Sequence, residues 1–476
     1  MTTSRMIRIL DNTQYTEENN EEYKLLKSWG ACTIGSLMNS KKNTFIVYPY
    51  SLQKTEDKLK ENATVISYDG KTYRTGNVVG FIRHKDNEIH IHSRFSSEND
   101  YFIYYMLEKV MSINLFSNKA QSFHTKGLNN LLWVFFPALL NRALTQGVYK
   151  KYVYRSFNNP NIKGIIDIKQ HIRLNYPPNG KIAYKTRELR YDNSVTQLIR
   201  HTIEYMIRTK DGKMLLEKDS TTKESVQLIV KATPSYNAKL LKTVFIKNLK
   251  PVVHPYYNHY TALHQLCMNI LNNDTMEYRL NGQNHDFGIL IDVAWLWEEY
   301  LDTIFKRHLG IDYKHPHNKM GRENDSFNIF EDNNLKEDTI PYIQPDFYNE
   351  GKWVIDAKYK PYSTLLLPPK DYNTGTEHLG LRNDRLQILA YMYLIKAPHG
   401  IIAVPGNTNV APGQDFRIKR HEDKSHENTF HESAYMHLVA LPVNSAGIKD
   451  YHNYIEEMKQ RESQFTERIK NIIDGQ

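Results

Sequence analysis

The sequence Val354-Ile355-Asp356-Ala357-Lys358-Tyr359-Lys360 is an apolar run that ends in an acid and a lysine, and Gln344-Pro345-Asp346-Phe347 lies just before it. The apolar residues before Asp356 predict a short buried strand with the carboxylate at its mouth. Asp346 stands ten positions earlier, so the two acids are expected at neighbouring strand ends. Because side chains alternate along a strand, Lys358 is expected on the same face as Asp356.

This arrangement of residues predicts a magnesium site. Asp346 and Asp356 can converge on one hard cation, with the carbonyl oxygen of Ala357 as a further ligand. Mg²⁺ keeps several waters and takes one or two protein carboxylates alongside a substrate phosphate. The bound ion would polarise a phosphoryl oxygen and help to form hydroxide from water. The ammonium of Lys358 could then orient the attacking water or stabilise the developing charge.

Two flanking helices are predicted to contribute further site residues. A helix from Asp292 to about Leu309 carries Glu298, which is a candidate third acid, although a solvated helix acid would look the same. A second predicted helix, Leu386 to Ile395, places Gln387 and Tyr391 four residues apart and therefore on one face. These two side chains would shape the site, or would form an ordinary packing pair.

Asp, a variable gap and then Asp-Ala-Lys is the signature of the PD-(D/E)xK nucleases. Four motifs occur here in one order and spacing: Leu-Trp-Glu-x-Tyr-Leu, Pro-Asp-Phe, Ile-Asp-Ala-Lys-Tyr-Lys and Asp-x-x-Gln-x-x-x-Tyr. Together they resemble the McrC family, the nuclease subunits of McrBC-type modification-dependent restriction systems. The similarity runs from about residue 75 to the C-terminus and is strongest over 290–395. Ser93-Arg94 departs from the family, which usually has Pro-Lys there.

The resemblance implies a Mg²⁺-dependent endonuclease subunit that cuts double-stranded DNA. In such systems a partner with an AAA+ motor recognises DNA, hydrolyses GTP and translocates. The resemblance also implies that the N-terminal region of this chain inserts into the ring of that McrB-like partner and stimulates hydrolysis. The chain has no Gly-x-x-x-x-Gly-Lys-Ser/Thr phosphate loop of its own, which fits this division of labour.

A length of 476 residues predicts two or three domains, since one ordinary domain is shorter. We expect an α/β and α+β multidomain chain. Its parts are a β-rich N-terminal domain over 1–115 that docks to the AAA+ partner, a basic and mainly helical middle region over 116–280, and a PD-(D/E)xK nuclease domain over 281–476.

Hydrophobic patterning predicts the main elements of these regions. Strands are expected at Thr44–Tyr48, Val78–Ile82, Glu88–His92, Gly400–Val404 and His437–Val443. Helices are expected from Asp100 to Val110, Ser194 to Arg208, Thr261 to Leu271 and Ile455 to Ile473. Asp100 is the expected cap of its helix, and Asp192 or Asn193 that of the Ser194 helix.

The charge is unevenly distributed. The net charge of the chain is +9, but residues 101–280 alone carry +15, whereas residues 281–400 carry −5. The basic residues concentrate over 141–190, with tyrosines interleaved, which suits a surface that grips a phosphate backbone. A solvated basic face is the alternative. The sequence leaves open whether this region contacts DNA or the partner.

Composition excludes several other classes of protein. No run approaches the roughly 20 apolar residues of a membrane span, and the first residues lack the apolar core of a secretory signal. Two cysteines, Cys32 and Cys267, cannot build a disulfide framework or a thiolate zinc site and are expected in the core. The histidines at 421, 426, 431 and 437 lack zinc-protease spacing and indicate a polar loop between two strands. We therefore expect a soluble, cytoplasmic protein.

Two other functions compete with the restriction subunit. A stand-alone repair or recombination nuclease would share the fold and would cut DNA without nucleotide. A catalytically idle adaptor would only stimulate a motor, but it would need neither both acids nor the lysine. The target base or DNA sequence and the stoichiometry of the complex are not encoded in these motifs.

Overall fold

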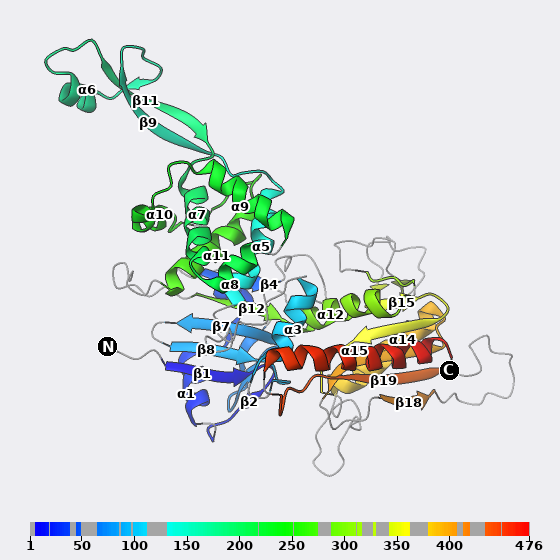
Figure 1. Cartoon of the computed structure of the whole chain (residues 1–476). Coiled ribbons are helices and arrows are strands. Elements are labelled where there is room, and N and C mark those ends of the chain that lie inside the picture. Colours follow the sequence, from blue (N-terminus) through cyan, green and yellow to red (C-terminus); the bar gives the residue numbers. More distant parts are fainter. Residues whose placement is uncertain are drawn as a thin grey trace, which may run out of the picture. The chain divides into compact units, whose positions relative to one another are not determined.

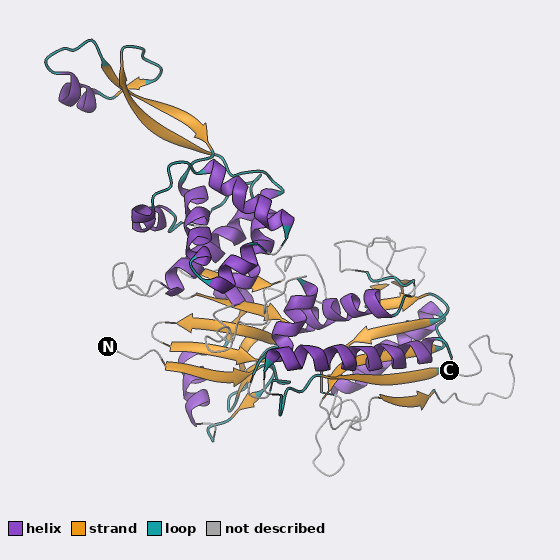
Figure 2. Cartoon of the chain, viewed as in Figure 1, coloured by secondary structure: helices purple, strands orange, loops and turns teal. Residues whose placement is uncertain are grey.

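The computed structural model follows the chain through two compact units, shown in Figures 1 and 2. It describes residues 5–18, 20–38, 44–48, 64–84, 87–96, 99–111, 131–217, 219–250, 252–274, 287–310, 312–316, 327–329, 342–361, 379–406, 413–418, 434–448 and 450–475. One unit combines Met1–Lys119 with His285–Gln476, and the other is Ala120–Asn284. The outer two predicted regions therefore form one unit, while the limits of the middle region lie close to those predicted.

The N-terminal part of the first unit is built on a five-stranded mixed sheet. Its strands in spatial order are β1 (Arg5–Leu10), β8 (Asn87–His92), β7 (Val78–His84), β12 (Phe287–Asp292) and β4 (Thr44–Tyr48). The predicted hairpin is confirmed, because β7 and β8 pair antiparallel. β12 lies in the range predicted for the nuclease domain but pairs with β7 and β4. A domain boundary at residue 281 would therefore separate β12 from the other strands of its sheet.

A glycine makes the pairing of β7 with β12 possible. Gly80 has a φ of +141°, and a Cβ built there would lie 1.9 Å from the carbonyl oxygen of Ile289. Only glycine allows the two backbones to approach this closely. The apolar residues of β12, Ile289, Leu290 and Ile291, are fully buried in this sheet. Their burial stabilises β12 here rather than in the sheet that follows it in the sequence.

A smaller sheet packs beside the first within the same unit. It consists of β2 (Gln14–Tyr15), β6 (Tyr73–Thr75), β5 (Thr64–Tyr68) and β3 (Cys32–Thr33), accompanied by helices α1 (Asn20–Trp29) and α2 (Ile34–Met38). One apolar cluster joins the two sheets, with Ile9, Val65 and Ile91 among its members. The N-terminal part of this unit is therefore rich in β-structure.

Three helices form the polar and aromatic interior of the first unit. They are α3 (Tyr101–Val110), α12 (Val293–His308) and α15 (Tyr451–Ile473). The hydroxyl of Tyr300 donates to the buried carboxylate of Glu462 at 2.8 Å, and Lys109 lies 3.5 Å from the same group. Asp100 precedes α3 as predicted, but its side chain makes no capping bond and instead pairs with His92 at 2.5 Å.

The C-terminal part of the first unit contains a second five-stranded sheet. The order is β15 (Phe347–Asn349), β16 (Trp353–Ala357), β17 (His399–Gly406), β19 (Tyr435–Pro442) and β18 (Gly413–Arg417). The central three strands are parallel, and the two outer strands are antiparallel to their neighbours. Helix α14 (Leu379–Ile395) packs its apolar residues against β16 and β17, and a short ladder of β13 (Phe327–Asn328) and β14 (Tyr342–Ile343) lies nearby.

The second unit is a helical bundle that carries a long β-hairpin. The helices are α5 (Leu131–Leu144), α7 (Ser194–Ile207), α8 (Lys210–Leu216), α9 (Ser220–Ala232), the 3₁₀ turn η2 (Ala238–Leu240), α10 (Leu241–Lys247) and α11 (His259–Asp274). The predicted cap of α7 is Asn193, whose side chain accepts from the N–H groups of Val195 and Thr196. Thr202, the polar residue inside the buried face of α7, donates to the carbonyl of Leu198 at 3.1 Å.

The hairpin, called the arm below, extends from this bundle in Figure 1. It comprises β9 (Lys151–Asn159), β10 (Ile165–Ile166), α6 (Ile168–Asn175) and β11 (Ile182–Arg190), with β11 pairing antiparallel to β9 and β10. The prediction of a mainly helical region holds for residues 194–274 but not for the arm. Both faces of β9 are largely exposed, so its sequence lacks the alternation that normally identifies a strand.

Among the described residues, no helix is long and apolar enough to cross a bilayer.

Candidate active site

The two acids of the central motif lie level with each other on adjacent strands. Phe347 of β15 pairs with Ile355 of β16, and this register sets Asp346 opposite Asp356. The side chain of Asp346 crosses to the neighbouring strand, where its Oδ2 accepts the backbone N–H of Ala357 at 2.7 Å. The geometry therefore brings both carboxylates to one end of the β15–β16 pair, as the sequence predicts.

Asp356 is buried, with only 1% of its surface exposed. Burial raises the pKa of its carboxyl, while the nearby ammonium of Lys358 and a hydrogen bond with the Asp346 side chain lower it. Its Oδ2 atom receives no well-directed hydrogen bond from the described residues, although Lys358 Nζ lies 3.1 Å away. A buried carboxylate oxygen in this state fits a site that is completed by a cation.

Lys358 faces the two acids and the following helix. Its Nζ donates to Oε1 of Gln387 at 2.9 Å, and its backbone N–H donates to the carbonyl of Ala403 at 2.9 Å. Burial lowers the pKa of this lysine, but the carboxylates of Asp356 and Asp346 outweigh burial and raise the pKa above its usual value. The side chain is therefore a permanent ammonium on the same strand face as Asp356.

Helix α14 holds Lys358 through a short chain of hydrogen bonds. Gln387 accepts from Lys358 and donates its Nε2 to the hydroxyl of Tyr391 at 2.7 Å. The hydroxyl of Tyr391 lies 3.4 Å from the carbonyl oxygen of Gln344, just before Asp346. One turn earlier on α14, Asp384 pairs with Lys360 at 2.5 Å. The predicted pair at positions 387 and 391 thus connects the lysine to the segment that carries the first acid.

Glu298 reaches this group of residues through a histidine. Helix α12 begins at the cap residue Asp292, which accepts from the N–H groups of Ala294 and Trp295. Oε1 of Glu298 lies 3.9 Å from Nε2 of His315. Nδ1 of His315 lies 2.6 Å from the carbonyl oxygen of Asp346. His315 therefore lies between Glu298 and the backbone of Asp346.

His315 is the residue that sequence reasoning missed. The sequence motifs predict no role for this histidine. Residues 312–316 do contain no helix, but two backbone hydrogen bonds between Lys314 and Tyr348 attach them to β15. The ring of His315 stacks on Phe347 at 4.4 Å. Nothing in the local spacing signals this contact, because 31 residues separate the histidine from Asp346.

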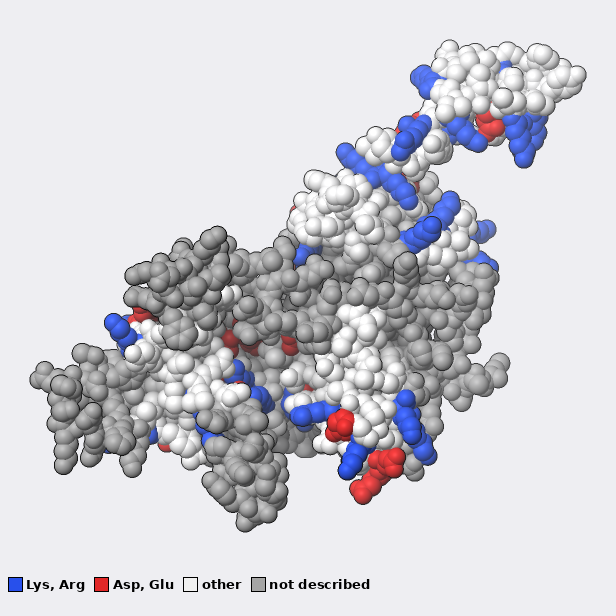
Figure 3. All heavy atoms as spheres, turned by 180° about the vertical axis from the view of Figure 1, so that it is seen from behind, with Lys and Arg blue, Asp and Glu red and all other residues white. Residues whose placement is uncertain are grey.

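The basic arm shows which of its predicted aromatic residues are accessible. The exposed basic residues that follow it in Figure 3 are Lys151, Arg155, Lys163, Lys169, Arg173, Lys181, Lys185, Arg187 and Arg190. Tyr152, Tyr154 and Tyr176 are exposed, and the guanidinium of Arg187 lies 4.3 Å from the centre of the Tyr152 ring. Tyr149 and Tyr184 are buried and cannot grip a ligand, which corrects part of the predicted surface.

The remaining signals are structural. The histidines at 421, 426 and 431 lie outside the described residues. His437 lies in β19, where it contacts His399 and Asp415. Cys267 is buried and Cys32 partly so, and burial raises the pKa of their thiols to about 12 and about 11. Neither is a reactive thiolate.

The geometry defines a class of protein: a two-unit α/β chain whose mixed sheet gathers two carboxylates and a lysine at one strand end. Residues 73–403 match the profile of the family described as "McrBC 5-methylcytosine restriction system component". The match spans more than half of the sequence, and the chain belongs to this family.

Comparison with solved structures gives two similar assemblies from Thermococcus gammatolerans. One is a refined half-complex of McrB AAA+ hexamers with bound McrC, 15% identical, with a TM-score of 0.41, covering 96% of this chain and 100% of that one. The other is a cryo-EM structure of the McrBC complex, 13% identical, with a TM-score of 0.29, covering 65% and 90%. A comparison with curated proteins found no match.

Proposed function

We propose that this chain is the nuclease subunit of a McrBC-type restriction complex and that its C-terminal sheet is a PD-(D/E)xK nuclease fold. The observation that carries the proposal is the meeting of Asp346, Asp356 and Lys358 at one end of the β15–β16 pair. Family membership supports a role in a restriction system, and the three side chains of the site support phosphodiester hydrolysis as the reaction.

The residues fit a bound Mg²⁺ ion. Asp346 and Asp356 would hold it, with the Ala357 carbonyl as a further oxygen ligand and Glu298 as an outer acid, because Mg²⁺ requires few protein ligands beside substrate phosphate and water. When bound, the ion polarises the phosphoryl oxygen and lowers the pKa of water at the site. The buried Oδ2 of Asp356 supports this assignment, since a cation would complete its contacts.

Lys358 acts on the reacting groups. Its ammonium is held between Asp356 and Gln387, where it can orient the attacking water and stabilise the charge that develops on the phosphoryl oxygens. Gln387 and Tyr391 position this lysine by hydrogen bonding. Each of these side chains therefore has a separate task, and each can be removed separately by mutation.

The partner follows from the family and the site. We propose a McrB-like, GTP-hydrolysing AAA+ subunit that delivers double-stranded DNA and is stimulated by this chain, with docking through the region of residues 1–115. The exposed basic arm is a surface for DNA or for this partner. Replacing Arg155 and Arg187 by alanine decides between them: weaker, less salt-dependent DNA binding assigns the arm to DNA.

The experiment that tests the proposal uses the reconstituted complex. Asp356→Ala should abolish cleavage of a methylated plasmid while GTP hydrolysis remains stimulated. Glu350→Ala is the matched control, because this exposed acid lies in the turn of the same strand pair. Full cutting by Asp356→Ala would rule out this site. Robust cleavage by the wild-type chain alone, with Mg²⁺ and no nucleotide, would favour the stand-alone nuclease instead.

A further inference from the structure

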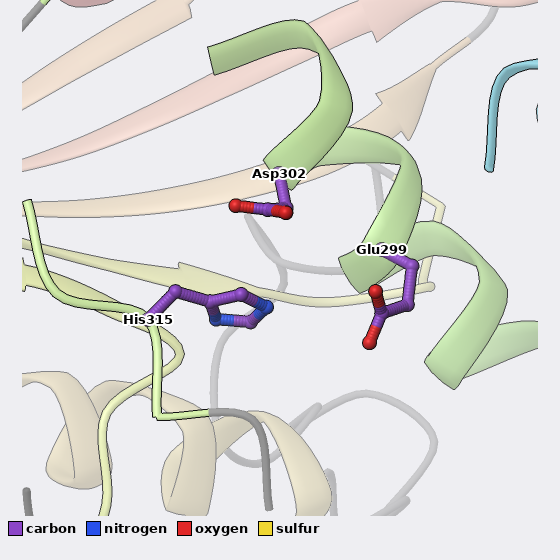
Figure 4. A group of neighbouring side chains, drawn as sticks. All are labelled: Glu299, Asp302 and His315. Atoms are coloured by element: carbon purple, nitrogen blue, oxygen red, sulfur yellow. The ribbon is translucent and has the colours of Figure 1, made fainter. Parts of the chain in front are cut away.

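A second group of potential metal ligands lies beside the candidate active site. Glu299 and Asp302 of α12 and His315 of the following loop each offer one ligand atom, and these atoms lie within 4.8 Å of one another. Figure 4 shows the two carboxylates on successive turns of the helix and the imidazole pointing toward them. Ligands of one ion lie up to about 4.2 Å apart when each bond is about 2.1 Å, so small side-chain movements would close the group.

The two elements that supply these residues are held in place. Glu299 and Asp302 are three residues apart and share a face of α12, and the helix is anchored by its buried residues Leu296, Leu301 and Phe305. The backbone N–H of Lys314 donates to the Tyr348 carbonyl at 2.9 Å, and the reverse bond measures 3.0 Å. The loop therefore presents its histidine from a fixed position.

The hydrogen bonding of His315 selects the ring nitrogen that faces the carboxylates. Nδ1 lies 2.6 Å from the carbonyl oxygen of Asp346, and because a carbonyl only accepts, Nδ1 donates. In the neutral ring, Nε2 then carries the lone pair, and this atom points toward α12. Metal-binding histidines commonly donate their second nitrogen to a backbone carbonyl in this way, which fixes the ring and its tautomer.

The carboxylate of Asp302 is supported in the manner of a metal ligand. The hydroxyl of Tyr313 donates to its Oδ1 at 2.9 Å, and Lys306 pairs with its Oδ2 at 2.5 Å. Only 7% of the Asp302 side chain and 4% of the His315 side chain are exposed. Each carboxylate oxygen has two lone pairs, so these donors leave room for an ion and hold the group in one orientation.

A cavity of about 560 Å³ reaches this group. Its lining includes Asp302, Tyr313 and His315 together with Lys306 and Asp312. It provides an entry path and space for the waters that would complete the coordination of an ion held by three protein atoms.

We propose that Glu299, Asp302 and His315 form a second divalent-cation site, distinct from the Asp346–Asp356 site. One imidazole nitrogen and two carboxylates favour Mn²⁺ or Zn²⁺ over Mg²⁺, which prefers oxygen ligands. The ion ties the 312–316 loop to α12. Through the bond between His315 and the Asp346 carbonyl, it also fixes the segment that enters the active site.

The test is a count of the Mn²⁺ ions bound to the full-length chain, by calorimetric titration with Mn²⁺ as the probe. The wild-type chain should bind two ions, Asp356→Asn one, His315→Ala one, and the double variant none with comparable affinity. His308→Ala is the matched control, since this exposed histidine lies at the end of the same helix, and it should retain both ions.

One outcome overturns the second site directly: if His315→Ala still binds as many ions as the wild type, the cluster holds no metal. Glu299→Gln removes one ligand with little change in shape and serves as the test if His315→Ala does not fold. It should lower the affinity for the same ion by about ten- to a hundredfold. Two ions retained by Asp356→Asn would contradict the proposed nuclease site but not this one.

Discussion

The two compact units differ in whether they bury charged side chains. Asp11, Asp356 and Glu462 are almost completely buried in the unit formed by Met1–Lys119 and His285–Gln476, each close to a basic side chain. Among the described residues of Ala120–Asn284, no Asp, Glu, Lys or Arg is buried, and the interior polar groups are neutral, including His201 and His264. Burying a charge is costly, so the unit that retains buried charges is the one in which to expect chemistry.

Among the substitutions that test this difference between the units, removal of the Lys358 ammonium should have the largest effect, and the quantity affected is plasmid cleavage. In Lys358→Met, plasmid cleavage by the complex should fall by roughly a hundred- to a thousandfold, because the ammonium that stabilises the developing charge beside the metal is then missing. Mn²⁺ binding to the chain should persist, since both acids remain. Cleavage within twofold of wild type would show that the buried pair is only structural.

Gln387→Leu should reduce cleavage by about ten- to a hundredfold, because Lys358 loses the amide oxygen that orients it. Leu386→Gln is the control on the same helix, at a position that is about half exposed. The two variants should separate clearly in a single-turnover cleavage assay. Equal rates would mean that Gln387 and Tyr391 are a packing pair without a role in the site.

The buried histidines of the second unit should make its stability depend on pH. Burial lowers the pKa of His201 and of His264 to about 4, from 6.5. The unfolded chain binds protons at pH 6.5 that the folded chain does not, so this stability is complete above 6.5 and is lost as pH falls toward 4. At pH 5, each histidine should lower the free energy of unfolding by roughly 2 kcal/mol relative to neutral pH.

Denaturant unfolding at pH 7 and pH 5 measures this loss. His264→Gln should show a smaller loss between the two pH values than the wild type, because one titrating group is gone. An unfolding free energy that does not change over this range would contradict the assignment of both histidines as neutral interior groups.

Substitutions on the arm should have the smallest effect on stability. Ile165 is 78% exposed, so Ile165→Ser should change the free energy of unfolding by less than about 0.5 kcal/mol. The same denaturant titration at pH 7 checks this. A larger loss would mean that the tip of the arm packs on another surface in solution.

Local patterns predicted much of the architecture. The helix that begins at Asp292, the cap of α7 at one of two adjacent residues, the β7–β8 hairpin and the strand that carries Asp356 all follow from a few adjacent residues. Predictions failed where distant segments decide the structure. Here β12 joins the N-terminal sheet because Gly80 admits it, and the exposed strands of the arm lack a buried face that would mark them.

The candidate site divides in the same way. The spacing of Asp356 and Lys358 on a strand, and of Gln387 and Tyr391 on a helix, predicted which side chains share a face. The contacts of Lys358 with Asp356 and of Gln387 with Tyr391 agree. The contact of His315 with the Asp346 carbonyl depends on how a loop attaches to β15. No periodicity within the sequence encodes that attachment.

The central claim is that Asp346 and Asp356 share one divalent ion beside Lys358. Anomalous diffraction from crystals of the chain grown with Mn²⁺ and a short DNA duplex tests it most directly. The account predicts a peak within bonding distance of both carboxylates, with a DNA phosphate on the side of Lys358. A structure in which the duplex is bound elsewhere and no ion lies between these two acids would contradict it.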